Sequence, residues 1–161
     1  SLFRFVLPVR RVNRVDVNTR QGNPADGETE ERPLRILLAE DVEENRALLA
    51  AYLAKTPYRL TMVADGVEAV RQVQTALFDV VVMDVQMPGM DGYTATRLIR
   101  AWEIEQARAP LPIIALSAHA MEGEMERSRE AGCTLYLSKP IRKKVLLDAL
   151  RWIGSPEGRR P

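Results

Sequence analysis

Five short apolar runs, each followed by a longer segment with helical spacing, are the feature of this chain that most constrains its fold. The runs begin at Arg35, Arg59, Val80, Ile113 and Leu135. The segments with helical spacing lie near residues 43–55, 66–77, 92–102, 121–131 and 141–153. A regular alternation of strands and helices predicts βα units built around a parallel sheet.

The polarity of each run predicts where its strand lies in the sheet. The runs from Arg35, Val80 and Ile113 are continuously apolar, as expected of strands that helices cover on both faces. The runs from Arg59 and Leu135 mix apolar and polar residues, which favours the two edges. With right-handed crossovers, these edges fit a doubly wound, five-stranded α/β sheet, (βα)5 and flavodoxin-like, with strand order 2-1-3-4-5.

Polar or charged residues stand at the carboxyl ends of four of these strands. Glu40 and Asp41 follow the first strand, Asp84 ends the third, Ser117 ends the fourth and Lys139 follows the fifth. Any one of them alone is typical of a solvated loop or a helix cap. Doubly wound sheets bind their ligands outside the carboxyl ends of the strands, so the joint occurrence predicts a functional site there.

The chemistry of this set favours phosphoryl transfer. Three carboxylates at about 4 Å repel by about 4 kcal/mol for each pair at an effective dielectric near 20, and a divalent cation relieves that repulsion. Hard oxygen ligands favour Mg²⁺ or Mn²⁺. Asp84 is then the nucleophile that forms an acyl phosphate, while Lys139 neutralises charge and Ser117 donates to a phosphoryl oxygen.

The same residues resemble the receiver domains of two-component response regulators. The resemblance runs from Pro33 to about Ile153 and rests on LLAEDVEENR, VVMDVQMPGMDG, IIALSAHA and LSKP. By position it implies metal-binding acids at Glu40 and Asp41, a phosphorylated Asp84, a metal-ligating carbonyl at Gln86, a switch pair at Ser117 and Tyr136, and a phosphate-binding Lys139. It also implies a cis bond between Lys139 and Pro140. The family more commonly has Asp at the position of Glu40 and Thr at that of Ser117.

The resemblance further implies a conformational switch and a control of its lifetime. Phosphorylation is expected to draw Ser117 inward, to shift Tyr136 and to change the surface around the last two helices and the fifth strand. The side chains of Gln86 and His119 flank the approach of the water that removes the phosphate. His119 is either a surface residue or a group that makes dephosphorylation depend on pH. Such a domain catalyses only its own phosphorylation and dephosphorylation.

Two functions of other classes remain open at this point. The first is a metal-dependent phosphohydrolase with an aspartyl nucleophile, as in the haloacid-dehalogenase family, which has a second acid two positions after the nucleophile where this chain has Gln86. The second is a nucleotide-binding or flavin-binding module on the same fold. No Gly-rich phosphate loop follows the first strand, where Glu40 and Asp41 stand instead.

Composition limits the partners and the compartment. The 23 basic and 22 acidic residues give a net charge of +1, so no direct nucleic-acid partner is expected. No apolar stretch approaches the roughly 20 residues of a membrane span, so we expect no membrane contact by this fragment, while an anchor elsewhere in a parent chain stays open. The lone Cys133 indicates a reducing, cytoplasmic location. The expected partner is a histidine kinase or phosphotransfer domain that carries a phosphohistidine.

The segment before Pro33 has a different texture. Residues 1–11 begin with SLFRFVLPVR, which resembles the last strand of a histidine-kinase ATP-binding domain. Residues 12–32 are poor in large apolar residues and rich in turn formers, which is typical of a linker. We therefore expect a strand remnant (1–11), a linker (12–32), a receiver domain (33–153) and a C-terminal tail (154–161), from a hybrid sensor histidine kinase.

Overall fold

Strands and helices alternate along the chain in the computed structural model, which describes residues 32–118 and 122–158. The strands are β1 (Arg35–Ala39), β2 (Arg59–Val63), β3 (Val80–Asp84), β4 (Ile113–Ser117) and β5 (Leu135–Ser138). The helices are α1 (Glu43–Leu53), α2 (Gly66–Thr75), α3 (Gly92–Glu105), α4 (Glu122–Ala131) and α5 (Lys143–Gly154). The predicted βα pattern is therefore confirmed.

The five strands form one parallel sheet in the order β2-β1-β3-β4-β5, so the predicted topology and fold class are confirmed. All five residues of β3 and all five of β4 are buried. In β2, by contrast, only Val63 is buried. The two strands of mixed polarity, β2 and β5, lie at the edges of the sheet, as predicted. An edge strand has a neighbour on one side only, so it is less covered and tolerates polar residues.

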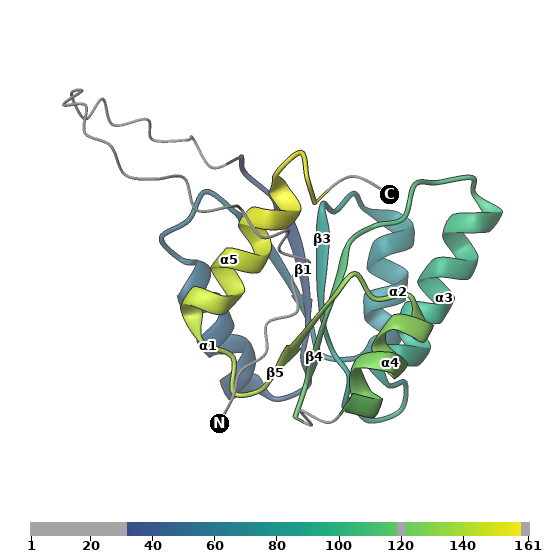
Figure 1. Ribbon diagram of the computed structural model, residues 1–161, viewed down its shortest axis with the longest axis horizontal. Coiled ribbons are helices and arrows are strands. Elements are labelled where there is room, and N and C mark those ends of the chain that lie inside the picture. The colour runs from purple at the N-terminus through teal and green to yellow at the C-terminus, as the bar shows by residue number, and fades with distance from the viewer. Residues whose placement is uncertain (1–31, 119–121, 159–161) are drawn as a thin grey trace, which may run out of the picture. The chain divides into compact units, whose positions relative to one another are not determined.

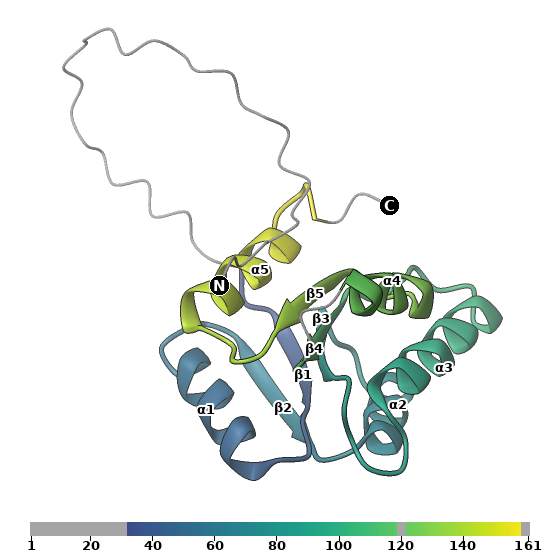
Figure 2. The ribbon, with the colours of Figure 1, turned by 60° about the horizontal axis from the view of Figure 1, so that its bottom comes forward.

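Helices cover both faces of the sheet, with α1 and α5 on one face and α2, α3 and α4 on the other (Figure 1). Ile36 and Leu38 of β1 pack into the core beneath α1 and α5. Leu37 and Ala39, which point the other way, pack into the core beneath α2 and α3. A central strand is apolar at every position because both of its faces are covered. Helix α4 lies beside α3 and β5, as Figure 2 shows from a second direction.

Helix ends differ from the predicted ones by a few residues. Helix α1 ends at Leu53 because Thr56 turns the chain there, with its amide and its hydroxyl both donating to the Leu53 carbonyl (3.0 and 2.7 Å). Helix α3 continues to Glu105, beyond the predicted end. These differences leave the carboxyl ends of the strands unchanged. Within the described ranges, no helix is long and apolar enough to span a membrane.

Candidate functional site

Three carboxylates meet at the carboxyl end of the sheet. Glu40 and Asp41 follow β1, and Asp84 ends β3, which pairs with β1 at the point where the strand order reverses. One oxygen from each carboxylate lies within 4.8 Å of the others. Glu40 and Asp84 are buried and Asp41 is partly buried. The fold therefore collects the acidic residues at its switch point, as predicted.

The ammonium of Lys139 lies between two of these carboxylates. Its Nζ is 2.8 Å from Glu40 Oε2 and 2.7 Å from Asp84 Oδ2. The residue comes from the loop after β5, where its bond to Pro140 is cis, as the resemblance implied. Burial lowers the pKa of Lys139, but the hydrogen bonds to Asp84 and Glu40 outweigh burial and raise that pKa above its ordinary value. The ammonium therefore stays charged at neutral pH.

Both oxygens of Asp84 accept hydrogen bonds. Oδ2 accepts from Lys139, and Oδ1 accepts from the backbone amide of Gln86 at 3.0 Å. Burial raises the pKa of Asp84 and the charge of Glu40 adds to this, while the two hydrogen bonds oppose it; the net shift is upward. The single charge of Lys139 therefore does not balance the negative charge of the carboxylates around it.

The first turn of α1 fixes the acidic pair through two residues that the sequence analysis missed. The Asn45 amide donates to Glu40 Oε1 at 3.0 Å. Arg46 Nη1 donates to the backbone carbonyls of Glu40 and Asp41, at 2.6 and 2.8 Å. Both lie in the LLAEDVEENR segment, and the available signal was their place one helical turn after the loop.

Ser117 and Tyr136 lie together on the neighbouring strands. Ser117 ends β4 and is buried, and its hydroxyl is hydrogen-bonded to Tyr136 of β5. Burial raises the pKa of Tyr136, so its phenol is neutral. The two residues of the predicted switch pair are therefore in contact, while their role stays a prediction.

The donor set fits a hard divalent cation. The cluster offers carboxylate oxygens from Glu40, Asp41 and Asp84. These three charges and the single charge of Lys139 sum to −2. Carboxylate oxygens are the ligands that Mg²⁺ prefers, and the ion keeps several waters when it binds to proteins. The residues present thus suit Mg²⁺ or Mn²⁺ in kind and in charge.

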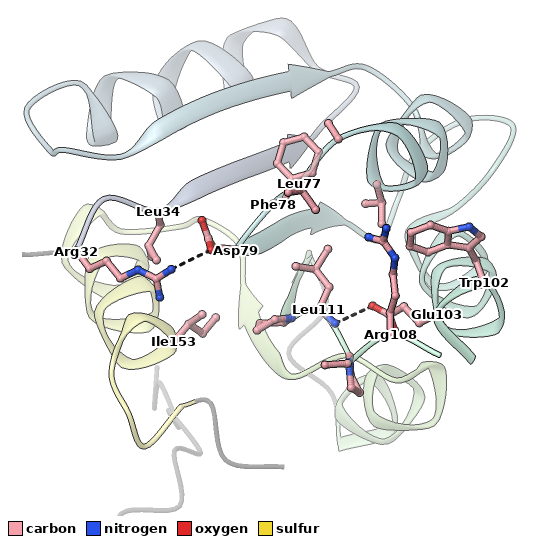
Figure 3. A pocket seen from close by; sticks show the side chains of 15 residues that line it. Arg32, Leu34, Leu77, Phe78, Asp79, Trp102, Glu103, Arg108, Leu111 and Ile153 are labelled. Carbon is pink, nitrogen blue, oxygen red and sulfur yellow. Dashed lines mark hydrogen bonds and ion pairs between the residues drawn. The ribbon is translucent and has the colours of Figure 1, made fainter. Parts of the chain in front are cut away.

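A separate cavity of about 320 Å³ lies at the opposite end of the sheet, where the strands begin (Figure 3). Its apolar lining includes Leu34, Leu77, Phe78, Trp102 and Ile153. Asp79, which also lines the cavity, accepts hydrogen bonds from the Arg35 amide and Nε (2.9 and 3.0 Å). Glu103 accepts from the Leu111 amide at 2.7 Å and from Arg100 Nη1 at 2.6 Å. Asp79 therefore links the segment before β3 to the start of β1, and Glu103 links α3 to the segment before β4.

The structure places the remaining predicted site residues as follows. Gln86 puts its backbone amide on Asp84, and its side chain lies at the surface. His119 lies outside the described residues.

A doubly wound sheet with an acidic cluster and a lysine at its switch point defines a receiver-type α/β domain.

Comparison with known proteins places the chain in a family. Residues 36–151 match the response regulator receiver domain, and the chain belongs to that family. Sensor protein GacS of Pseudomonas syringae pv. syringae is 44% identical over 124 residues, which cover 76% of this chain and 14% of that protein. The chain thus spans a small part of this relative's length.

Solved structures agree with this assignment. The receiver domain of sensor histidine kinase PA1611 from Pseudomonas aeruginosa PAO1, with a magnesium ion coordinated in its active site cleft, is 44% identical with a TM-score of 0.68. That match covers 76% of this chain and 99% of the other. A chain from the co-crystal of the Saccharomyces cerevisiae histidine phosphotransfer protein Ypd1 with the Ssk1 receiver domain has a TM-score of 0.73, 27% identity, and coverage of 76% and 89%. Family membership argues against the phosphohydrolase and the nucleotide or flavin module.

Proposed function

We propose that this chain accepts a phosphoryl group from a phosphohistidine onto Asp84, with Mg²⁺ or Mn²⁺ bound beside it, and changes conformation in response. The observation that carries the proposal is the position of Lys139, whose Nζ lies 2.7 Å from Asp84 and 2.8 Å from Glu40 at the switch point of the sheet. Phosphoryl transfer depends on positive charge held in advance where the phosphoryl oxygens arrive. A lysine fixed by two buried carboxylates supplies such a charge.

Asp84 is the nucleophile in this proposal. One of its carboxylate oxygens forms a bond to phosphorus while the P–N bond of the donor breaks. The imidazole leaves with the electron pair and takes a proton from solvent. Lys139 then pairs with the phosphoryl oxygens, and Ser117, from the neighbouring strand end, donates a hydrogen bond to them.

The residues that would hold the metal ion are Glu40, Asp41 and Asp84, through carboxylate oxygens, and Gln86, through its backbone carbonyl. When bound, the ion neutralises carboxylate charge and polarises the phosphoryl group. The magnesium ion in the PA1611 receiver domain, which is 44% identical to this chain, supports the assignment.

Acetyl phosphate tests the assignment of Asp84. Intact-mass spectrometry should show one added phosphoryl group with Mg²⁺ and none with excess EDTA. Asp84→Asn should abolish the addition. Asp65→Asn is the matched control, because Asp65 caps α2 by accepting from the Glu68 amide (2.7 Å) and Asn caps helices equally well. Full labelling of Asp84→Asn would refute the proposal, and repeated release of phosphate from a small ester would favour a phosphohydrolase.

We propose a histidine kinase or phosphotransfer domain as the donor. The complex of the related Ssk1 receiver domain with the phosphotransfer protein Ypd1 supports a partner of this type. A hollow of about 330 Å³ lies beside Glu40 and Lys139, and Leu48, Leu49 and Ile141 give it an apolar lining. An apolar surface beside Lys139, which contacts Asp84, suits a partner that must bring its imidazole to Asp84.

We propose that this chain is a cytoplasmic part of a hybrid sensor histidine kinase. The receiver spans residues 33–153, the linker 12–32 and the tail 154–161, and residues 1–11 end an ATP-binding domain. The similarity to the receiver domain of the sensor histidine kinase PA1611 supports this origin.

Two pairs of residues are proposed to control the response. Ser117 moves toward the phosphoryl group and releases Tyr136, to which it is hydrogen-bonded in the unmodified protein. Gln86 and His119 flank the path of the hydrolytic water and set how long the phosphate lasts.

A further inference from the structure

Helix α4 is attached to the rest of the receiver unevenly. Its two buried residues within 123–131, Ser128 and Ala131, both lie in its second half. The residue directly after that end is also tied to α3, because Arg100 Nε donates to the Gly132 carbonyl at 3.0 Å. Between residues 123 and 127, by contrast, every residue except Glu124 is exposed.

Glu124 is held by a tyrosine of α3. The hydroxyl of Tyr93 lies 3.1 Å from Glu124 Oε2 and 3.3 Å from the Glu124 backbone carbonyl. Arg127 Nη1, one turn further along α4, donates to the other carboxylate oxygen at 3.2 Å. Burial, followed by the hydrogen bond to Glu124, raises the pKa of Tyr93, so its hydroxyl is protonated and donates. The Tyr93 hydroxyl therefore joins the first half of α4 to α3.

The backbone next to Tyr93, at the start of α3, is fixed to the end of the strand that carries Asp84. Gly92 donates its amide to the Val85 carbonyl at 2.9 Å. A Cβ atom at Gly92 would lie 2.1 Å from the Asp84 carbonyl oxygen, so helix and strand meet without room for a side chain. The first turn of α3 is therefore fixed beside Asp84 through Gly92, and the next residue, Tyr93, contacts α4 through its hydroxyl.

The same tyrosine shares a small core with the switch aromatic. Tyr93 packs in a cluster with Val85, Ala115 and Ala131, and Tyr136 packs against that cluster. The charge of Glu124 acts on both phenols. Both tyrosines that contact this cluster therefore also form a hydrogen bond with a polar residue, Tyr93 with Glu124 and Tyr136 with Ser117.

We propose that Tyr93 is a positioning residue of the switch, whose hydroxyl holds the first half of α4 through Glu124 in the arrangement of the unphosphorylated protein. The inference rests on the proposed function, because the state that this bond opposes is the phosphorylated one. A bond that exists in one of two states shifts the equilibrium toward that state. Loss of the bond should therefore loosen α4 at rest and favour the phosphorylated state.

Hydrogen exchange tests the first consequence without any ligand. Tyr93→Phe removes one oxygen and keeps the ring, so the core cluster should remain packed. Exchange of the amides of residues 125–127, the first in α4 with intrahelical acceptors, should become about tenfold faster, as expected for loss of one partly exposed hydrogen bond to a charged group. Tyr52→Phe on α1, in the opposite layer, is the matched control and should leave these amides unchanged. Unchanged exchange in Tyr93→Phe would overturn the proposal.

Binding of beryllofluoride with Mg²⁺ tests the second consequence. Tyr93→Phe should bind this phosphoryl mimic severalfold more tightly than the parent, whereas a variant that is merely damaged would bind it equally or more weakly. Equal or weaker binding would overturn the proposed role of Tyr93 in the switch. If the parent itself bound no mimic, the proposed function would fail and the switch role with it, while the exchange result would still decide whether Tyr93 holds α4.

Discussion

Replacement of Lys139 by Met tests the charge balance of the site. The substitution keeps an unbranched side chain of similar length and removes the ammonium that lies 2.8 Å from Glu40 and 2.7 Å from Asp84. Two buried carboxylates then face each other without their cation. In EDTA at pH 7 we expect the variant to lose about 3 kcal/mol of unfolding free energy.

Three effects bound this loss of unfolding free energy. Each lysine–carboxylate pair is worth about 6 kcal/mol at these distances and an effective dielectric near 20. The cost of desolvating the lysine cancels several kcal/mol of that gain. Protonation of Asp84 limits the loss, because taking up a proton at pH 7 costs a carboxyl of ordinary pKa about 4 kcal/mol. The expected loss of about 3 kcal/mol in unfolding free energy lies below that limit.

The pH dependence has a definite sign. Without Lys139 the pKa of Asp84 rises further above its value in the unfolded chain, since burial and Glu40 are no longer opposed by the ammonium. A carboxyl with a raised pKa in the folded state destabilises that state as pH increases. The deficit of Lys139→Met should therefore shrink to about 1.5 kcal/mol at pH 5, where protonation costs less.

Urea denaturation in EDTA and in Mg²⁺ measures these differences. Lys144→Met is the matched control, because its ammonium pairs with Asp148 at 2.7 Å on the surface of α5 with its side chain 85% exposed. It should change stability by less than about 0.5 kcal/mol. Mg²⁺ should stabilise Lys139→Met more than the parent, because the ion replaces the missing charge. A variant as stable as the parent in EDTA at pH 7 would refute the reasoning.

Three further predictions concern other parts of the chain. Burial raises the pKa of Asp79, but the hydrogen bonds from Arg35 outweigh burial and hold that pKa below its ordinary value. Asp79→Asn should therefore cost about 1–2 kcal/mol at pH 7 in denaturant titrations, and the difference should disappear as pH falls through the lowered pKa. Gly92→Ala should destabilise the protein by about 3 kcal/mol or more, because its Cβ meets backbone at 2.1 Å, whereas Gly123→Ala, with nothing within 4 Å, should stabilise it by up to about 1 kcal/mol. If His119 acts on the hydrolytic water, dephosphorylation timed between about pH 6 and 8 should titrate in the parent but not in His119→Ala, and identical profiles would assign the residue to the surface.

The strand positions, and the meeting of the acidic residues with Lys139, were predictable because they depend on local and repeating features. Apolar runs such as VVVMD from Val80 coincide with a strand whose two faces are both buried, so pattern and structure carry the same information. The carboxyl ends of parallel strands share one edge of the sheet, so the strand pattern alone predicts that Glu40, Asp84 and Lys139 lie close together, as they do.

Contacts between side chains of separate helices were not predictable in the same way. The bond from Tyr93 to Glu124 joins residues 31 positions apart and depends on the angle between α3 and α4, which no local pattern encodes. The end of α1 depends on two hydrogen bonds from Thr56, which compete with continued helical spacing. Such features arise from tertiary packing, which overrides local propensity.

The double anchoring of Lys139 follows from the charge that phosphoryl transfer would add. Three carboxylates and one ammonium sum to −2, which a bound divalent cation brings to neutrality. Conversion of the Asp84 carboxylate to an acyl phosphate removes one negative charge and adds about two. The added charge appears beside Lys139, which must then leave Asp84 Oδ2 for the phosphoryl oxygens. Because Glu40 Oε2 also holds the ammonium, at 2.8 Å and fully buried, Lys139 keeps one fixed partner while it exchanges the other.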